Sequence, residues 1–191
     1  MKTIIIMRHG KPKTDLELLK KVKTTPEKLG RIIQEYENCS LAWDSRPPQS
    51  ALEVAKSCRA LVSSDLPRAQ ESARLLLPER EVYVDAIYRE STLPHAHWNR
   101  PQLTFFTWAL IFRVFWLMGF SKNGESIGKA KKRAGKAVEQ IIKLTDKHGS
   151  VLLMGHGIIN RLIAKTLEAQ DWQRMSCSGE QYWAYSVYQK A

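Results

Sequence analysis

Residues 3–10 read Thr-Ile-Ile-Ile-Met-Arg-His-Gly, and the expected fold follows from this stretch. A continuous apolar run such as Ile4–Met7 is typical of a strand that is buried on both faces of a sheet. Residues 151–157, Val-Leu-Leu-Met-Gly-His-Gly, repeat the pattern, since a second apolar run leads into a His-Gly pair. We therefore expect two central strands that deliver His9 and His156 to one edge of a sheet.

The chain between these two runs alternates between strand-like and helix-like patterns. Such alternation predicts an α/β fold, a three-layer α/β/α sandwich with a mostly parallel central sheet. Ligands of such sheets bind beyond the carboxyl ends of the strands, where both His-Gly pairs are expected to lie. The expected helices cover residues 26–36, 50–59, 67–77 and 125–147, and the expected further strands cover residues 60–63, 81–84 and 181–189.

Size, charge and cysteine content indicate the number of domains, the kind of partner and the cellular compartment. A chain of 191 residues can build a substantial core, so we expect one domain over residues 1–191. The formal net charge of +11 attracts anions, which could be phosphorylated metabolites, nucleic acid or a membrane surface. Cys39, Cys58 and Cys177 form no CxxC motif, and the N-terminus does not resemble a signal peptide. These features predict free thiols and a cytoplasmic location.

Residues 91–124 have the pattern of a helical insertion over the ligand-binding edge. Within them, residues 103–120 (LTFFTWALIFRVFWLMGF) approach the length of a membrane span, but Arg113 interrupts the middle. We therefore expect a hydrophobic helix that packs on the domain with its aromatic side chains in the core. The alternative is a helix that lies on a membrane surface, which its aromatic residues and the positive charge of the protein would suit.

Several polar motifs fall at the ends of the expected strands. Residues 63–73 read SSDLPRAQESA, where a strand ends in serines and a helix begins with proline. Arg68 then stands in the first turn of that helix, where the helix dipole favours a bound anion. Gly-His-Gly at 155–157 is a second such junction, and Arg-His-Gly at 8–10 places a cation beside an imidazole. Together with the carboxylate of Glu90, these residues form a charge-complementary set.

The order and spacing of four motifs resemble those of the histidine phosphatase superfamily, also called the phosphoglycerate mutase-like family. These motifs are RHG at 8–10, SSDLPRAQESA at 63–73, RE at 89–90 and GHG at 155–157. The resemblance extends over nearly the whole chain and implies the α/β sandwich of that family. It implies His9 as the nucleophile and Glu90 as the proton donor. The implied phosphate clamp consists of Arg8, Arg68 and His156, with Gly157 also at the substrate.

These residue types suit transfer of a phosphoryl group. A neutral imidazole such as His9 can attack phosphorus in line and form a phosphohistidine, which divides one difficult displacement into two easier ones. Arg8 and Arg68 stay charged and present forked donors to the phosphoryl oxygens, and His156 adds another donor. Glu90 would protonate the departing alkoxide and later accept a proton from water. This chemistry requires no metal or other cofactor.

Two stretches differ from the family pattern or have a supporting role. After RHG, residues 11–14 read Lys-Pro-Lys-Thr, where many relatives carry Glu and, a few positions later, an Asn near the phosphate. No such Asn is identifiable here. Gly-Glu-Ser at 124–126 resembles a family stretch that we assign, together with Arg133, to helix capping and support.

Several residues have more than one interpretation. Asp85 or Glu125 could supply the proton instead of Glu90, whereas Arg89 is expected to be peripheral. His95 and His97 have a metal-binding spacing, but without a nearby carboxylate or cysteine cluster we expect a loop at the pocket mouth. The basic stretch Lys129, Lys131, Lys132, Arg133 and Lys136 is interpreted as a solvated helix face, because no aromatic residues are interleaved to stack on bases.

The leading hypothesis is a phosphomonoesterase that hydrolyses a small phosphorylated metabolite through His9, with no nucleic-acid partner. The rivals from the same family are a mutase-like phosphotransferase and a phosphohistidine protein phosphatase. From another class, the chain could be a noncatalytic module that binds phosphate or a membrane surface. Retention of two histidines, two arginines and a carboxylate argues against that module, because anion binding alone needs no nucleophile or proton donor.

Overall fold

The structure of the protein, a computed structural model, describes residues 1–14 and 19–190. Within these residues a six-stranded sheet has the order β4-β3-β6-β1-β8-β7. The strands β4, β3, β6 and β1 run parallel, and β8 is antiparallel to both of its neighbours. This topology confirms the predicted mostly parallel sheet. The strands are β1 (Lys2–Arg8), β3 (Ala60–Ser63), β4 (Val82–Val84), β6 (Ser150–Gly155), β7 (Gln173–Cys177) and β8 (Tyr185–Lys190).

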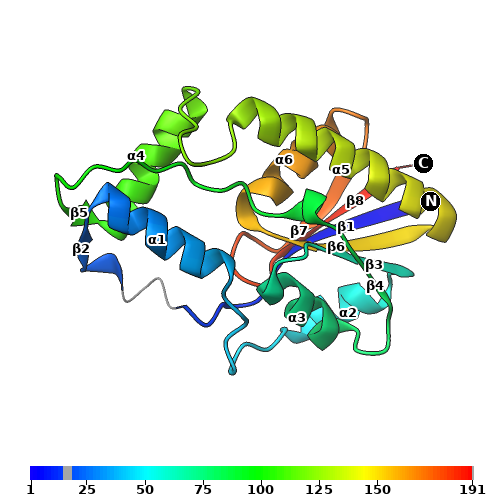
Figure 1. Ribbon diagram of the computed structural model, residues 1–191. Coiled ribbons are helices and arrows are strands. Elements are labelled where there is room, and N and C mark those ends of the chain that lie inside the picture. The colour runs from blue at the N-terminus through cyan, green and yellow to red at the C-terminus, as the bar shows by residue number, and fades with distance from the viewer. Residues whose placement is uncertain (15–18, 191) are drawn as a thin grey trace.

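Helices cover both faces of the sheet and also extend beyond one edge of it. Helices α5 and α6 pack on one face of the sheet and form one cluster of buried side chains with it, and α2 and α3 form a second cluster on the other face. Figure 1 shows α1 and α4 at one end of the molecule, beyond the carboxyl ends of the central strands. The helices are α1 (Pro26–Glu37), α2 (Gln49–Lys56), α3 (Pro67–Leu76), α4 (Phe105–Leu117), α5 (Ile127–His148) and α6 (Gly157–Glu168), with a 3-10 turn, η2 (Ala86–Tyr88), and a small sheet of β2 (Lys23–Thr24) and β5 (Leu103–Thr104).

The continuous apolar runs have a simple physical reason. Side chains alternate between the two faces of a strand, and both faces of β1 are covered. Ile4 and Ile6 therefore pack in the cluster of α5 and α6, while Ile5 and Met7 pack in the cluster of α2 and α3. Every position of the run consequently lies in a core.

The ends of some elements differ from the sequence-based predictions. The helix expected from residue 125 begins at Ile127, because the Ser126 hydroxyl caps it by accepting a hydrogen bond from the Lys129 amide. The closing strand begins at Tyr185, since residues 181–184 form a turn in which Trp183 has a φ of 66°. The polar and exposed edge strand β7 carries no apolar alternation and was not predicted.

Helix α4 packs on α1 through one face. Phe105, Trp108 and Phe112 join the α1 residues Leu29 and Ile33 in a cluster separate from those on the sheet. The prediction that all the aromatic residues near 105–116 belong to a core is wrong, because Phe106 and Phe115 are more than a third exposed. Within the described residues, no helix combines the length and apolarity needed to span a membrane.

Candidate active site

The two predicted histidines lie side by side where β1 and β6 end. These strands pair in parallel with Arg8 opposite Gly155, so His9 and His156 follow at adjacent positions. Their ring centroids are 5.0 Å apart, and both side chains are almost fully buried. The sheet register therefore brings together two residues that are 147 positions apart in the sequence.

The hydrogen bonds of His9 determine which ring nitrogen carries a proton. Nδ1 lies 2.7 Å from the Gly10 carbonyl oxygen, which can only accept, so Nδ1 must donate. Nε2 accepts a hydrogen bond from Nε of Arg68 at 3.2 Å. Burial, followed by the charge of Arg68, lowers the pKa of His9 well below its usual value, although the Gly10 hydrogen bond opposes this shift. His9 is therefore neutral near pH 7, with the lone pair of Nε2 directed toward a guanidinium.

Arg68 stands in the first turn of α3, as the sequence predicted, and is 1% exposed. Its Nη1 donates to the carbonyl oxygens of Tyr36 and Glu37 at 2.8 and 2.9 Å, and its guanidinium lies 4.8 Å from the centroid of the Tyr36 ring. The C-terminal end of α1 thus fixes the arginine beside His9. A buried cation held in this way is ready to bind an anion without rearrangement.

Arg8 and His156 have buried polar atoms without a partner among the described residues. Arg8 donates from Nη1 to the Glu180 carbonyl oxygen at 2.7 Å, but its Nε has no partner. Neither ring nitrogen of His156 has one. Burial, followed by the neighbouring His9 and Arg68, lowers the pKa of His156 well below its usual value. Buried polar atoms without a partner are rare in proteins, and here they belong to two residues that adjoin His9.

Glu90 lies at the N-terminus of α6. Its Oε1 accepts hydrogen bonds from the amides of Ser91, Ile158 and Ile159, whereas its Oε2 shares only the Ile158 amide. A Cβ added at Gly157 would lie 3.5 Å from Oε2, in ordinary van der Waals contact, so this oxygen lies next to Gly157. The carboxylate is thus held beside His156 with one oxygen largely uncommitted.

The other candidate proton donors have structural contacts. Asp85 is exposed and caps the η2 turn by accepting from the Ile87 amide. Both carboxylate oxygens of Glu125 accept from Arg133, at 2.9 and 2.6 Å. Arg133 also donates to the carbonyl oxygens of residues 87 and 89, so this pair supports the segment that leads to Glu90. Arg89 forms an ion pair with Asp65 away from the histidines, as expected of a peripheral residue.

Gly10 is required by close packing behind the histidine. An added Cβ would lie 2.4 Å from a ring carbon of Trp183 and 2.6 Å from Oγ of Ser45. The Gly10 amide donates to Ser72, and Trp183 donates to Ser45. Thus α3 and the turn before β8 lock the position of the RHG segment.

Three residues near the site were not identified from the sequence. The Tyr182 ring lies 5.7 Å from that of His9 and 4.5 Å from the Arg8 guanidinium. Proximity of Tyr182, after burial, raises the pKa of Tyr36, which places the two phenols together beside the clamp. Arg113 of α4 has a buried Nη1 without a described partner, and its pKa is lowered by burial and raised by the charge of Glu90. The sequence shows these side chains but not the contacts between distant segments.

Arg113 is held on the Glu90 side of the site. Its guanidinium stacks on Trp116 at 4.8 Å, and the Trp116 ring donates to the Glu125 carbonyl oxygen at 2.6 Å. Since Glu125 pairs with Arg133 beneath the Glu90 segment, α4 is tied to the same support. Arg113 forms no ion pair with a described residue.

The remaining candidates lie apart from this cluster. The rings of His95 and His97 are 6.0 Å apart, and Asn123 contacts both residues. No three potential metal ligands come together in residues 1–14 and 19–190.

In the basic stretch of α5 the lysines are exposed, whereas Arg133 turns inward. Cys39 and Cys58 are buried free thiols and Cys177 is an exposed one, as predicted. The segment that follows the Lys-Pro-Lys-Thr stretch at 11–14 includes residues 15–18, which are outside the described ranges.

The depressed pKa values of the two buried histidines predict acid sensitivity. Below about pH 6.5 the unfolded chain binds more protons than the folded one. The free energy of unfolding must therefore decrease as the pH is lowered, by up to about 1.4 kcal/mol per pH unit for each histidine. Urea denaturation between about pH 5 and 7 measures this slope. His156→Gln is expected to remove the contribution of one histidine; an unchanged slope would contradict the burial of a neutral His156.

Comparisons with known proteins identify the family of the chain and proteins with a similar fold. Residues 4–188 match the family model described as the histidine phosphatase superfamily (branch 1). No curated protein sequence matches the chain significantly. Among solved structures, mycobacterial hydrolase 1 has a TM-score of 0.67 and 19% identity, covering 98% of this chain and 88% of that one.

Two further structures carry ligands. The mycobacterial glucosyl-3-phosphoglycerate phosphatase in complex with VO3 has a TM-score of 0.61 and 19% identity, with 98% of this chain and 92% of that one covered. The phosphoserine phosphatase of Entamoeba histolytica in complex with 3-phosphoglyceric acid has a TM-score of 0.62 and 20% identity, with coverages of 98% and 90%. These similarities concern the fold. Because the family model extends from β1 to β8, the chain belongs to the histidine phosphatase superfamily, branch 1.

Proposed function

We propose that the protein is a metal-independent phosphomonoesterase of the cytoplasm that hydrolyses a small phosphorylated metabolite through a phosphohistidine on His9. One observation carries the proposal: Nδ1 of a neutral, buried His9 donates to Gly10, which leaves the lone pair of Nε2 facing Arg68. A nucleophile oriented beside a fixed cation is the arrangement that attack on a phosphoryl group requires. The free thiols suit a reducing compartment.

In the first step, Nε2 of His9 attacks phosphorus and the bond to the leaving oxygen breaks. Arg8, Arg68 and His156 hold the other phosphoryl oxygens, which supplies positive charge without a metal ion. Glu90 gives a proton from Oε2, its less committed oxygen, to the leaving group. In the second step water attacks the phosphohistidine, Glu90 takes the proton, and inorganic phosphate and free His9 result.

Arg113 supports a substrate whose leaving group is itself anionic. The proton donor must contact the leaving oxygen, so the remainder of the substrate extends past Glu90 toward the α4 segment. There Arg113 offers a guanidinium whose Nη1 has no described partner. A carboxylate is the simplest group that a guanidinium binds through two parallel hydrogen bonds. The relative crystallised with 3-phosphoglyceric acid holds a ligand with both a phosphate and a carboxylate.

Phosphate release in the presence of a chelator tests both parts of the proposal. Metal-free protein is expected to hydrolyse phosphoserine with a kcat/KM at least about tenfold above that for phosphoethanolamine, which lacks the carboxylate. Arg113→Gln should remove the preference mainly through KM, whereas Arg100→Gln, on an exposed loop, should keep it. Loss of all turnover in the chelator would contradict the metal-independent reaction; a preference that survives Arg113→Gln would contradict the assigned role of Arg113.

A further inference from the structure

Helix α4 exposes a continuous apolar stripe to solvent. Phe106, Leu110, Val114, Leu117 and Met118 are spaced three or four residues apart and therefore share one side of the helix. Leu110, Leu117 and Met118 are 66%, 63% and 80% exposed. We call these five residues the α4 outer face. Such a contiguous stripe is distinct from the single apolar residues that are common on protein surfaces.

Packing of α4 on the protein does not require this face. The opposite side of the helix already carries Phe105, Trp108, Phe112 and Trp116, all buried. Helices that are apolar on all sides are normally covered on all sides, by protein or by lipid. The contacts with α1 cover one side of α4. The α4 outer face is available to contact a second apolar surface, either protein or lipid.

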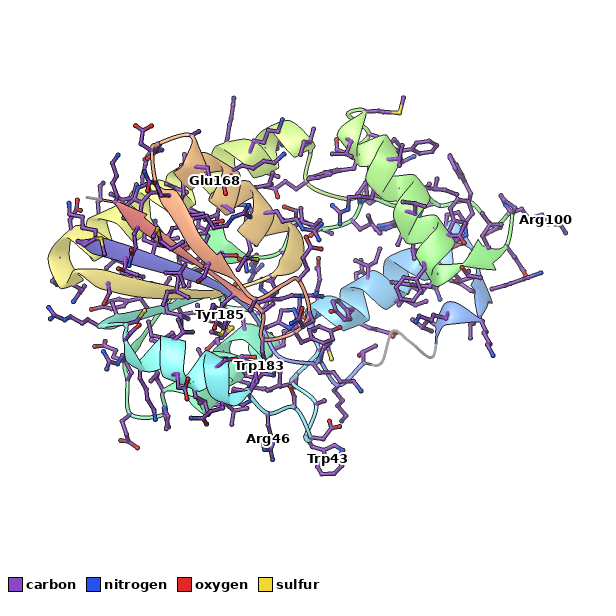
Figure 2. The ribbon with its side chains drawn as sticks, turned by 180° about the vertical axis from the view of Figure 1, so that it is seen from behind. Trp43, Arg46, Arg100, Glu168, Trp183 and Tyr185 are labelled. Carbon is purple, nitrogen blue, oxygen red and sulfur yellow. The ribbon has the colours of Figure 1, made fainter. Side chains whose placement is uncertain are left out.

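The charge around the α4 outer face indicates an anionic partner. Residues 91–124 contain no Asp or Glu. They contain two exposed cations, Arg100 before α4 in the sequence and Lys122 after it. Figure 2 shows Arg100 projecting from the end of the molecule near α4. Lys23 pairs through its backbone with Thr104 at the start of the helix and adds a third exposed cation.

The α4 outer face also carries an exposed aromatic residue, since Phe106 is 39% exposed. The Trp98 ring lies 6.4 Å from that of Phe112, on the opposite side of the helix, and is not part of this face. Phe and Leu beside Lys and Arg are typical of helices that bind the boundary between headgroups and acyl chains. A second copy of this chain would instead bring cations against cations on a protein of net charge +11, which opposes self-association.

We propose that the α4 outer face binds the surface of a membrane that contains anionic lipids, with α4 lying parallel to the bilayer. The apolar stripe enters the headgroup boundary, and Arg100, Lys122 and Lys23 contact the lipid phosphates. This binding is independent of the chemistry at His9, since none of the five stripe residues belongs to the proposed catalytic site.

Vesicle flotation of the whole protein tests this binding. The protein is expected to float with phosphatidylcholine vesicles that contain about 30% phosphatidylglycerol, and to bind pure phosphatidylcholine at least about tenfold more weakly. The neutral double variant Leu110→Gln/Leu117→Gln should bind anionic vesicles about tenfold more weakly than wild type. Leu75→Gln is the matched control, because Leu75 is an exposed leucine of α3 outside this face. Turnover should be unchanged in both variants, which also verifies that they fold.

Three results would overturn the proposal. The first is absence of binding to anionic vesicles. The second is equal binding by wild type and the double variant, which would reduce the interaction to adhesion through net charge. The third is a concentration-dependent dimer in light scattering that the double variant abolishes, because a second copy would then cover the α4 outer face.

Discussion

Replacement of His9 by alanine is expected to lower kcat by at least about five orders of magnitude and to eliminate any covalent phosphoenzyme. The reason is that Nε2 of His9 is the nucleophile held by Gly10 and Arg68, and the neighbouring ring of His156 lies 5.0 Å away at the position of a clamp residue. Discontinuous assays of phosphate release at saturating substrate, with wild type and His9→Ala, measure the loss of kcat.

Binding should survive this substitution. Arg8, Arg68 and His156 remain in place in His9→Ala, so inorganic phosphate should still bind with an affinity within about tenfold of wild type by calorimetry. His97→Ala is the matched control, since His97 is exposed and lies outside the cluster; it should retain full turnover. A His9→Ala variant that keeps more than about one hundredth of the wild-type kcat would exclude nucleophilic catalysis by this residue.

Glu90→Gln is expected to lower kcat/KM, which reports transfer of the phosphoryl group to His9, by about a thousandfold for alkyl phosphates, but by only about tenfold for p-nitrophenyl phosphate. An alkoxide needs a proton as it leaves, whereas p-nitrophenolate is stable without one. Glutamine has nearly the same size and keeps one oxygen to accept from the amides of Ile158 and Ile159, so the cap of α6 is retained. Parallel kcat/KM measurements on phosphoserine and p-nitrophenyl phosphate give the two ratios.

The dependence on leaving group separates proton donation from structural support. A residue that only holds α6 in place would lower kcat/KM for both substrates equally and would lower the melting temperature. Asp85→Asn is the control, because Asp85 caps the η2 turn and asparagine can do the same. Equal losses with both substrates in Glu90→Gln would remove Glu90 from its proposed role.

The sequence was sufficient to predict the centre of the fold and most of the residues that converge there. The runs Ile4–Met7 and Val151–Met154 are continuous because both faces of their strands are covered by helices, and a buried parallel pair aligns the residues that follow. The position of Arg68 followed from the proline that begins α3. These predictions depended on local patterns with a direct physical cause.

The parts that were missed depend on contacts between distant segments. Tyr182 reaches His9 because β8 adds antiparallel to β1, and no local pattern indicates that neighbour. Arg113 was interpreted only as a charge that interrupts an apolar segment, whereas the packing of α4 stacks it on Trp116, which in turn donates to Glu125. The same packing buries one side of α4 and exposes the other, a distinction that an all-apolar sequence cannot reveal.

The most direct test of the proposed mechanism is identification of the covalent intermediate. Wild-type protein would be mixed with p-nitrophenyl phosphate in a chelator, quenched within milliseconds in alkali, digested and analysed by tandem mass spectrometry. Glu90→Gln would be included to slow the second step, because this substrate forms the intermediate without a proton from Glu90. The proposed mechanism predicts one phosphoryl group on the peptide that contains His9, stable in alkali, lost in acid and absent from His9→Ala. Steady turnover with no phosphohistidine under these conditions, or with the phosphoryl group on another residue, would contradict it.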